Sequence, residues 1–403
     1  MRYAILALTL TAACTGGGPP KSDEPPEGTA TAMKTYGGDL AFLDEHQDVI
    51  ELSDTSGSSR VAVVAEYQGR VMTSTSGGTT GPSYGWLNRE AIAAKERRPH
   101  INVFGGEDRF WLGPEGGQYS IFFAQGDPFD LEHWQTPEPI DWGPWEVVDR
   151  SASEVRFRKS IELVNYAGTK LSLEASRAIR IVDRAAAGAE AVAYESENTI
   201  TNTGENTWTR ETGLLSVWIL GMFNPSPSTT IVIPFVAGSE ETLGPIVNDA
   251  YFGKVPADRL VVGDGVLYFR GDGEYRGKIG IPRKRALPVM GSYDAEGKVL
   301  TLVEYSLPAD ATDYVNSMWE ISDAPYTGDA ANSYNDGPPA PGKKPLGPFY
   351  ELESSSPAAE LSPGESLTHV HRTLHFRGPD AELDAVAKKT LGVSIADIVS
   401  AFR

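Results

Sequence analysis

The sequence predicts an all-β protein, a large antiparallel β-supersandwich with short helices near its C-terminal end. β-rich runs recur at close spacing, turn residues separate them, and little helical periodicity lies between them. The sequence shows no fixed-period repeat, which disfavours a propeller or a solenoid. The predicted strands span residues 49–52, 61–66, 70–75, 119–123, 146–148, 155–158, 160–164, 171–181, 191–201, 214–220, 230–235, 260–268, 299–305 and 367–376.

Helices are expected only near the two ends of the chain. Three are predicted, over residues 40–47, 381–391 and 395–402. Each follows a residue whose side chain can cap the first turn, namely Asp39, Asp380 and Ser394. Residues 324–346 are rich in Pro, Gly, Asn and Asp, which indicates a long loop.

The first residues resemble a bacterial lipoprotein signal peptide. Arg2 supplies a positive charge, and the apolar run after it is too short to span a bilayer. Small residues then precede Cys14, although Thr11 stands where a leucine is more usual. The resemblance implies export, lipidation of Cys14 and a membrane anchor facing the periplasm or the cell surface. The alternative is a plain cleaved signal with an incidental cysteine.

The rest of the chain divides by composition. Residues 1–13 form the predicted signal peptide, and residues 14–31 read as a flexible tether rich in Gly, Pro and charge. Residues 32–378 form the predicted β domain, followed by a helical segment over residues 379–403. Because Cys14 is the only cysteine, the chain has no internal disulfide and depends on its hydrophobic core.

The chain is acidic, with a formal net charge of -20 at pH 7. Nucleic acids and anionic lipid headgroups need basic surfaces, so neither is expected as a partner. Solubility alone is a sufficient explanation of the acidity.

A histidine-rich strand is the most distinctive feature of the sequence. The run 367–376 follows a Ser-Pro-Gly turn, and side chains in a strand alternate between its two faces. Arg372 therefore lies on the face opposite the histidines. Glu351 and Glu353 share a face of the preceding segment, and a hairpin would set these acids beside the imidazoles. The shared face carries His369, His371, Thr373 and His375.

A second dense segment, residues 105–118, holds charges and a tryptophan between paired glycines. Glycine allows tight turns and the close approach of a ligand. Arg109 could bind vicinal hydroxyls or a carboxylate through its forked donors. The alternative is a hairpin with ion-paired surface charges. The side chains concerned are Glu107, Asp108, Arg109, Trp111 and Glu115.

The order of several motifs resembles that of the galactose mutarotase-like superfamily. Within this superfamily, the resemblance is to uncharacterised families of exported bacterial lipoproteins. The motifs are Tyr67-Gln68-Gly69-Arg70-Val71, Gly105-Gly106, Arg109-Phe110-Trp111, Pro114-Glu115, Asn202-Thr203-Gly204, Trp218, residues 351–353 and Pro363-Gly364-Glu365-Ser366. The resemblance implies a supersandwich that binds carbohydrate in an open cleft. Its members include epimerases, glycoside hydrolases and lyases, so the fold alone does not choose the reaction.

The resemblance also implies an acid–base pair. The superfamily's mutarotases use a glutamate base and a histidine acid, and Glu351 or Glu353 matches the glutamate by position. No histidine lies between His133 and His369, so either the C-terminal histidines supply the acid or the chemistry differs. The predicted catalytic residues are Glu351, Glu353, His369 and His371. The predicted substrate contacts are Arg70, Glu107, Arg109, Trp111, Glu115, Asn335, Asp336, Arg372 and His375.

Other interpretations of the same residues stay open. His369 and His371 could hold a divalent metal with Glu351 or Glu353 as a third ligand, or they could be buried structural residues. Asn335 and Asp336 could bind sugar hydroxyls or calcium, although an Asn-Asp-Gly run is first a turn signal. Tryptophans in a Pro-rich stretch could stack on sugar rings or plug the edge of the sandwich. These are Trp134, Trp142 and Trp145.

The favoured hypothesis is therefore a carbohydrate-active lipoprotein, an epimerase or lyase. A hydrolase would need two carboxylates facing each other across the scissile bond. The competing hypotheses are a glycan-binding lipoprotein without catalysis and a metal-dependent glycan enzyme.

Overall fold

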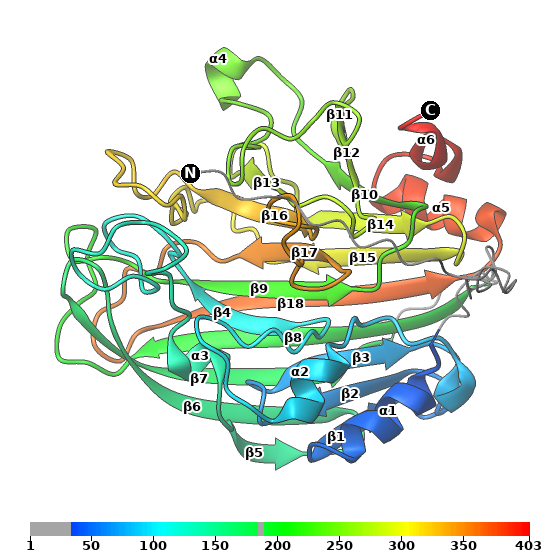
Figure 1. Ribbon diagram of the computed structural model, residues 1–403, viewed down its shortest axis with the longest axis horizontal. Coiled ribbons are helices and arrows are strands. Elements are labelled where there is room, and N and C mark those ends of the chain that lie inside the picture. The colour runs from blue at the N-terminus through cyan, green and yellow to red at the C-terminus, as the bar shows by residue number, and fades with distance from the viewer. Residues whose placement is uncertain (1–33, 184–188) are drawn as a thin grey trace, which may run out of the picture. The chain divides into compact units, whose positions relative to one another are not determined.

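The computed structural model describes residues 34–183 and 189–403. Within them the chain is mostly β, with three antiparallel sheets and short C-terminal helices (Figure 1), which confirms the predicted fold class. The predicted signal peptide, Cys14 and the tether lie outside the described residues. In these ranges, no helix has both the length and the apolar character that crossing a membrane requires.

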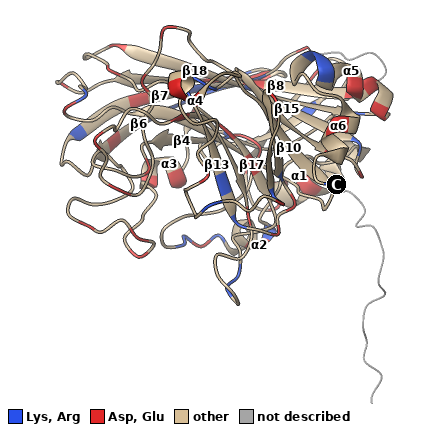
Figure 2. Cartoon of the chain, turned by 90° about the horizontal axis from the view of Figure 1, so that it is seen from above, with Lys and Arg blue, Asp and Glu red and all other residues tan. Residues whose placement is uncertain are grey.

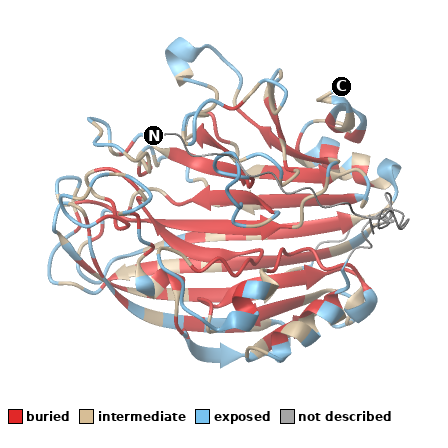
Figure 3. Cartoon of the chain, viewed as in Figure 1, coloured by how far each residue is buried: buried red, intermediate tan, exposed pale blue. Residues whose placement is uncertain are grey.

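The largest sheet has ten strands, and only its edge strand β5 is exposed along its whole length (Figure 3). Many of its strands are bordered by their neighbours in sequence, as short hairpin connections favour. In spatial order its strands are β11 (Leu260–Val262), β12 (Val266–Arg270), β10 (Thr229–Pro234), β14 (Val289–Asp294), β15 (Val299–Tyr305), β18 (Ser366–Arg377), β8 (Glu190–Asn202), β7 (Lys170–Ile181), β6 (Glu154–Val164) and β5 (Glu146–Arg150).

A five-stranded sheet packs against the large one. Apolar side chains from the two sheets pack together in two clusters of the core. Phe110 and Ile219 lie with Phe157 in one, and Leu352 lies with Val303 in the other. Period-two alternation sends every second side chain into this core and the others to the opposite face. In spatial order the strands are β13 (Gly277–Pro282), β16 (Asp329–Asn335), β17 (Tyr350–Ser355), β9 (Ser216–Phe223) and β4 (Arg109–Gly113).

Smaller elements complete the fold. A three-stranded sheet of β1 (Val49–Ser53), β2 (Arg60–Val64) and β3 (Arg70–Thr75) packs with α1 (Tyr36–Asp44) and α2 (Arg89–Ala94). Helices α5 (Asp380–Thr390) and α6 (Ile395–Ser400) cover the face of the large sheet that points away from the core. The short elements η1 (Gly78–Thr80), α3 (Glu138–Asp141) and α4 (Glu240–Leu243) lie in connections. Basic and acidic residues are interspersed along the described chain (Figure 2).

Two of the three predicted helix starts need correction. Helix α1 begins four residues earlier than predicted, because Thr35 caps it by accepting a hydrogen bond from the Gly38 amide. Asp39 lies inside that helix and pairs with Arg89. Helix α5 begins at Asp380 itself, after Pro379. The Ser394 cap of α6 is confirmed, with a complete capping box.

Several strand predictions also need correction. Residues 119–123 form turns and bends, whereas residues 155–158 and 160–164 belong to one strand. Residues 260–268 fold into two strands, because a Gly-Asp-Gly turn interrupts them. Strands β4, β13, β14 and β16 were not predicted, and β16 lies inside the predicted loop 324–346. Glycine, proline and small polar residues lower the strand propensity of β13, β14 and β16, but pairing with neighbouring strands overrides it.

Candidate active site on the five-stranded sheet

The shared face of the histidine strand is confirmed. His369, His371 and His375 lie on one face of β18 and are buried between the two sheets. The Ser354 hydroxyl lies 2.8 Å from both His369 Nε2 and His371 Nδ1. A hydroxyl has a single hydrogen, so at most one imidazole accepts from Ser354 and at least one donates to it. The two histidines therefore cannot both present an acceptor nitrogen to Ser354.

The predicted hairpin between the acidic segment and the histidine strand is wrong. Strand β17 pairs with β16 and β9 in the five-stranded sheet, whereas β18 pairs with β15 and β8 in the ten-stranded sheet. Ser354 points from β17 toward the histidines, so alternation sends Glu351 and Glu353 to the other face of their sheet. The acids and the imidazoles consequently lie on opposite sides of β17.

Burial explains the state of the two histidines. It lowers the pKa of His369 to about 3, with His371 contributing, and that of His371 to about 4. Both imidazoles are therefore neutral at physiological pH. The predicted third metal ligand, Glu351 or Glu353, lies on the far side of β17. In the described ranges, no three His, Cys, Asp or Glu side chains gather in a way that could hold a metal ion.

Two further predicted contacts are built into the interior. Glu107 is fully buried, accepts a hydrogen bond from the Ser74 amide at 2.6 Å, and lies 3.0 Å from His375 Nε2. Arg70 is also buried and donates to the Gly105 carbonyl and to the Gln68 side chain. These bonds hold β3 against the segment that leads into β4.

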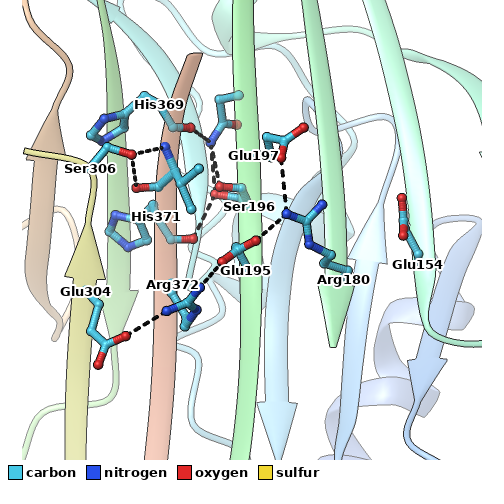
Figure 4. Close-up of polar contacts among 12 residues, drawn as sticks. Glu154, Arg180, Glu195, Ser196, Glu197, Glu304, Ser306, His369, His371 and Arg372 are labelled. Atoms are coloured by element: carbon cyan, nitrogen blue, oxygen red, sulfur yellow. Dashed lines mark hydrogen bonds and ion pairs between the residues drawn. The ribbon is translucent and has the colours of Figure 1, made fainter. Parts of the chain in front are cut away.

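Arg372 lies on the opposite face of β18 from the histidines (Figure 4). Its guanidinium links Glu304 on β15, at 2.8 Å, to Glu195 on β8, and Glu195 in turn pairs with Arg180 on β7. The register places these four residues in one row across the sheet. Opposite charges at facing positions of neighbouring strands stabilise their pairing. The contacts of Arg372 are therefore those of a residue that stabilises the sheet.

Asn335 and Asp336 also lie away from the other predicted contacts. Asn335 donates to Asp272 and to the Tyr275 carbonyl, and Asp336 accepts from the Tyr334 hydroxyl and the Gly347 amide. Both side chains thus fasten the end of β16 to its neighbouring loops.

The remaining predicted residues do gather, on the outer face of the five-stranded sheet. Glu353 is fully buried, and its Oε2 accepts from Lys278 Nζ at 3.0 Å and from Trp218 Nε1 at 2.9 Å. Its other oxygen, Oε1, receives no hydrogen bond from an N–H group of the described residues. The neighbouring acid is Glu351, whose carboxyl group is linked to that of Glu353 through a side-chain hydrogen bond.

Glu351 forms the second half of this carboxyl pair. Its Oε1 lies 3.2 Å from the Arg109 guanidinium, and both side chains are buried. Burial raises the pKa of Glu351 to about 8, with Arg109 opposing the shift and Glu353 adding to it. Glu351 therefore holds a proton at neutral pH. No described residue accepts a hydrogen bond from Arg109 Nε or Nη1.

Lys278 supplies the positive charge between two aromatic rings. Its Nζ lies 4.6 Å from the centre of the Trp218 ring and 5.5 Å from that of Tyr251. Burial lowers the pKa of Lys278, but the carboxyl groups of Glu353, Glu115 and Glu351 outweigh burial and leave it raised. The ammonium is thus charged, in line with its role as the partner of Glu353.

An aromatic wall borders the carboxyl pair. Arg109 lies 4.1 Å above the ring of Trp111, which packs edge-on against Trp218. Glu115 accepts a hydrogen bond from Trp319 Nε1 at 3.2 Å, and burial raises its pKa. Five predicted residues, Arg109, Trp111, Glu115, Glu351 and Glu353, therefore meet at one site.

The site also contains residues that were not predicted. Asp329 Oδ2 accepts from the Tyr251 hydroxyl at 2.6 Å, and burial raises the pKa of Asp329 to about 6. Asn332 lies beside them on β16 and contacts Tyr251. These side chains, with Lys278 and Trp218, line a cavity of about 10 Å³, room for about one water molecule.

One of these residues carried a usable signal. Lys278 stands between glycines and isoleucines, and a single charge in such a run indicates a buried side chain that needs a charged partner. Asp329 and Asn332 fall within a stretch whose composition indicates a loop. Tyr251 comes from an irregular connection, so its approach to Asp329 depends on tertiary structure alone.

A family model described as a family of unknown function, DUF6786, matches residues 34–402. The chain belongs to this family. No match was found among the curated proteins. The roles of individual residues are therefore argued from the contacts of this chain.

Structural similarities extend over most of the chain. A putative aldose 1-epimerase from Klebsiella pneumoniae is 11% identical, with 86% of this chain and 82% of that chain covered and a TM-score of 0.49. A putative aldose 1-epimerase from Escherichia coli is 13% identical, with coverages of 82% and 99% and a TM-score of 0.47. A galactose mutarotase-like protein from Lactobacillus casei is 12% identical, with coverages of 82% and 100% and a TM-score of 0.45.

Proposed function

We propose that this protein binds a carbohydrate at the outer face of the five-stranded sheet and transfers protons to and from it through Glu353 and Glu351. The observation that carries the proposal is the difference between the two carboxyl groups. Glu353 accepts hydrogen bonds from Lys278 and Trp218 through one oxygen, whereas Glu351 lies against Arg109 and burial raises its pKa to about 8. Two neighbouring carboxyl groups whose surroundings differ in this way can serve as base and acid.

The surroundings of the pair suit a polyhydroxylated ring. Trp218, Trp111 and Tyr251 supply aromatic surface, and sugar-ring carbons pack well on such faces. Arg109 and Asn332 supply donors, and Glu353 and Asp329 supply acceptors. Apolar surface with a few fixed polar groups is the usual composition of a small-molecule site.

The proposed reaction is the epimerisation of a cyclic sugar at its anomeric carbon. Glu353 accepts the proton of the anomeric hydroxyl, and Glu351 donates its proton to the ring oxygen as the bond between that oxygen and the anomeric carbon breaks. The carbonyl rotates and the ring closes with the reverse proton transfers, so atoms and charge balance. His369 and His371 take no part, because β17 separates them from the acids.

Exchange between anomers provides the test. Purified protein would be screened by thermal shift against mono- and oligosaccharides, and each sugar that binds would be followed by NMR exchange spectroscopy. We expect Glu353→Gln to reduce the exchange rate at least about 100-fold while binding persists. The surface variant Glu365→Gln, in the turn before β18, serves as the control and should match the wild type.

Other outcomes separate the alternatives. A sugar that binds without any exchange in the wild type would support the glycan-binding protein without catalysis. Loss of binding or turnover on chelation would support the metal-dependent enzyme. The absence of binding by every sugar in the panel would contradict the proposal.

We propose in addition that the chain is exported and anchored through a lipid on Cys14, as its N-terminal sequence indicates. Labelling of expressing cells with an alkyne fatty acid tests this directly. The wild type should incorporate the label and fractionate with membranes, and Cys14→Ser should do neither. Equal labelling of both proteins would contradict the anchor.

A further inference from the structure

The proposed site is closed. Glu351, Glu353 and Arg109 are all buried, and the adjoining cavity of about 10 Å³ accommodates about one water molecule. A sugar ring is many times larger, so it can reach Glu353 only after part of the wall has moved. The question is which part of the wall can move at low cost.

One side of the cavity is firmly built. Val315 and Ser317 line it, and their segment is fixed by backbone hydrogen bonds from Tyr314 to Tyr326 and from Asn316 to Pro325, at 3.1 and 2.8 Å. Tyr314 and Tyr326 are themselves buried in the core. Opening this side would expose apolar surface that is now packed between the sheets.

Another part of the wall is formed by Tyr251, in the irregular connection between α4 and β11. The neighbouring residues are open to solvent: Phe252 is 42% exposed, and the Lys254 side chain is 86% exposed. The Asn248 backbone exchanges two hydrogen bonds with Gly280, at 2.8 and 2.7 Å. Beyond that anchor, Tyr251 is held to the sheet by polar contacts with Asp329 and Asn332. Phe252 adds a half-exposed contact, edge-on against Tyr334 on β16 and beneath the Arg276 guanidinium.

We propose that Tyr251 is the gate of this site and that its hydrogen bond to Asp329 is the latch. When the 2.6 Å bond breaks, the segment swings from the Lys278 ammonium and opens the path to Glu353. The gate would serve the carbohydrate site proposed above, and in that respect it rests on that function. Its opening and closing belong to the protein alone and can be measured without a ligand.

The fit of Asp329 against the sheet supports a built latch. A Cβ added to Gly280 would lie 1.9 Å from Asp329 Oδ2, the same oxygen that accepts the bond from Tyr251. The absence of a side chain at position 280 therefore lets this carboxyl lie directly on β13. Asn248 Nδ2 also donates to that oxygen at 3.2 Å, so two residues of the covering segment converge on one acceptor.

Thiol labelling of the cavity wall tests the gate. Ser355 lines the cavity, and Ser355→Cys in the full chain would be treated with methyl methanethiosulfonate. The wild type gives the background from Cys14, and Ser56→Cys, on an exposed turn, gives the rate of an open thiol. We expect Ser355→Cys to react far more slowly than Ser56→Cys. Adding Tyr251→Phe should then speed its reaction about tenfold, as the loss of one hydrogen bond predicts.

The control replaces another loop tyrosine, Tyr275→Phe, and should leave the labelling rate unchanged. Equal rates with and without Tyr251→Phe, or a Ser355→Cys rate equal to that of Ser56→Cys, would overturn the gate. Should Ser355→Cys fail to fold, hydrogen exchange on the native chain decides instead. Residues 249–255 should exchange faster than β13, and faster again in Tyr251→Phe, whereas core-like protection would overturn the proposal. Labelling as expected without any sugar binding would leave the gate standing and remove the proposed ligand.

Discussion

Replacing Lys278 by methionine tests the electrostatics of the site most directly. The Lys278 ammonium lies 3.0 Å from Glu353 Oε2, and both side chains are buried. Methionine keeps much of the apolar stem but leaves Glu353 with only the Trp218 donor. Breaking a buried ion pair from one side costs about 3–5 kcal/mol. We therefore expect a loss of about 3–5 kcal/mol at pH 7.

The assay is denaturant unfolding at pH 7. The double variant Lys278→Met/Glu353→Gln should recover most of the loss, because it also removes the charged carboxyl group that Lys278→Met leaves without its partner. Lys254→Met is the matched control, because the Lys254 side chain is exposed and its contact with Asp249 is long, at 3.5 Å. Its effect on the free energy of unfolding should stay within about 0.5 kcal/mol. A loss below 1 kcal/mol for Lys278→Met, or no recovery in the double variant, would refute the reasoning.

Three further predictions concern the two sides of β17. Burial lowers the pKa of His369 to about 3 and of His371 to about 4, so the unfolded chain takes up protons first. Above pH 6.5 both histidines are neutral in the folded and the unfolded chain, and their contribution to the free energy of unfolding is complete. As the pH falls toward 4, each histidine lowers the free energy of unfolding by about 1.4 kcal/mol per pH unit. Unfolding between pH 6.5 and 5 should show a smaller slope in His371→Gln, and an unchanged slope would contradict the shift. Ser354→Ala should cost about 2–4 kcal/mol in the same assay, because two buried imidazoles lose their partner, and a cost below 0.5 kcal/mol would count against this arrangement. Glu351, with its pKa raised to about 8, contributes stability that is present below pH 4.5 and lost as the pH rises through 8. Glu351→Gln should therefore be more stable relative to the wild type at pH 8 than at pH 5, and the reverse trend would disprove the raised pKa.

Local sequence signals predicted much of the large sheet. Strand β18 alternates polar and apolar residues after a Ser-Pro-Gly turn, and its predicted span of residues 367–376 differs from the structure by one residue at each end. Its period also predicted that the histidines share a face. Both properties depend on neighbours in sequence, which is why they could be predicted from one sequence.

The five-stranded sheet was much harder to predict. Strand β16 reads Asp-Ala-Ala-Asn-Ser-Tyr-Asn, which has low strand propensity, yet every residue of it is buried. Its strand state comes from pairing with β13 and β17 on either side. Tertiary contacts of this kind override local preference and leave no periodic signal in the sequence. The residues missed at the site, Asp329 and Asn332 among them, lie on this strand.

The site was predicted in part for the same reason. Glu351, Glu353 and Arg109 were chosen for their residue type and spacing, and the structure brings them together. Their expected partners, His369 and His371, were assigned by nearness in sequence. Nearness in sequence does not decide which strands pair, because the connection between β17 and β18 crosses from one sheet to the other.

The alternation of β17 explains why the two polar systems stay separate. Glu353 points outward to Lys278, and the next residue, Ser354, points inward to the histidines. A shift of one residue in register would place a carboxylate between the sheets and a serine beside Lys278. The inner system would then bury an anion beside two imidazoles that burial keeps neutral, and the outer system would leave the ammonium without its partner. Each side therefore opposes the slip independently. The hydrogen bonds of Ser354 to the two histidines fix the register of β17. They thereby also hold Glu353 on the outer face.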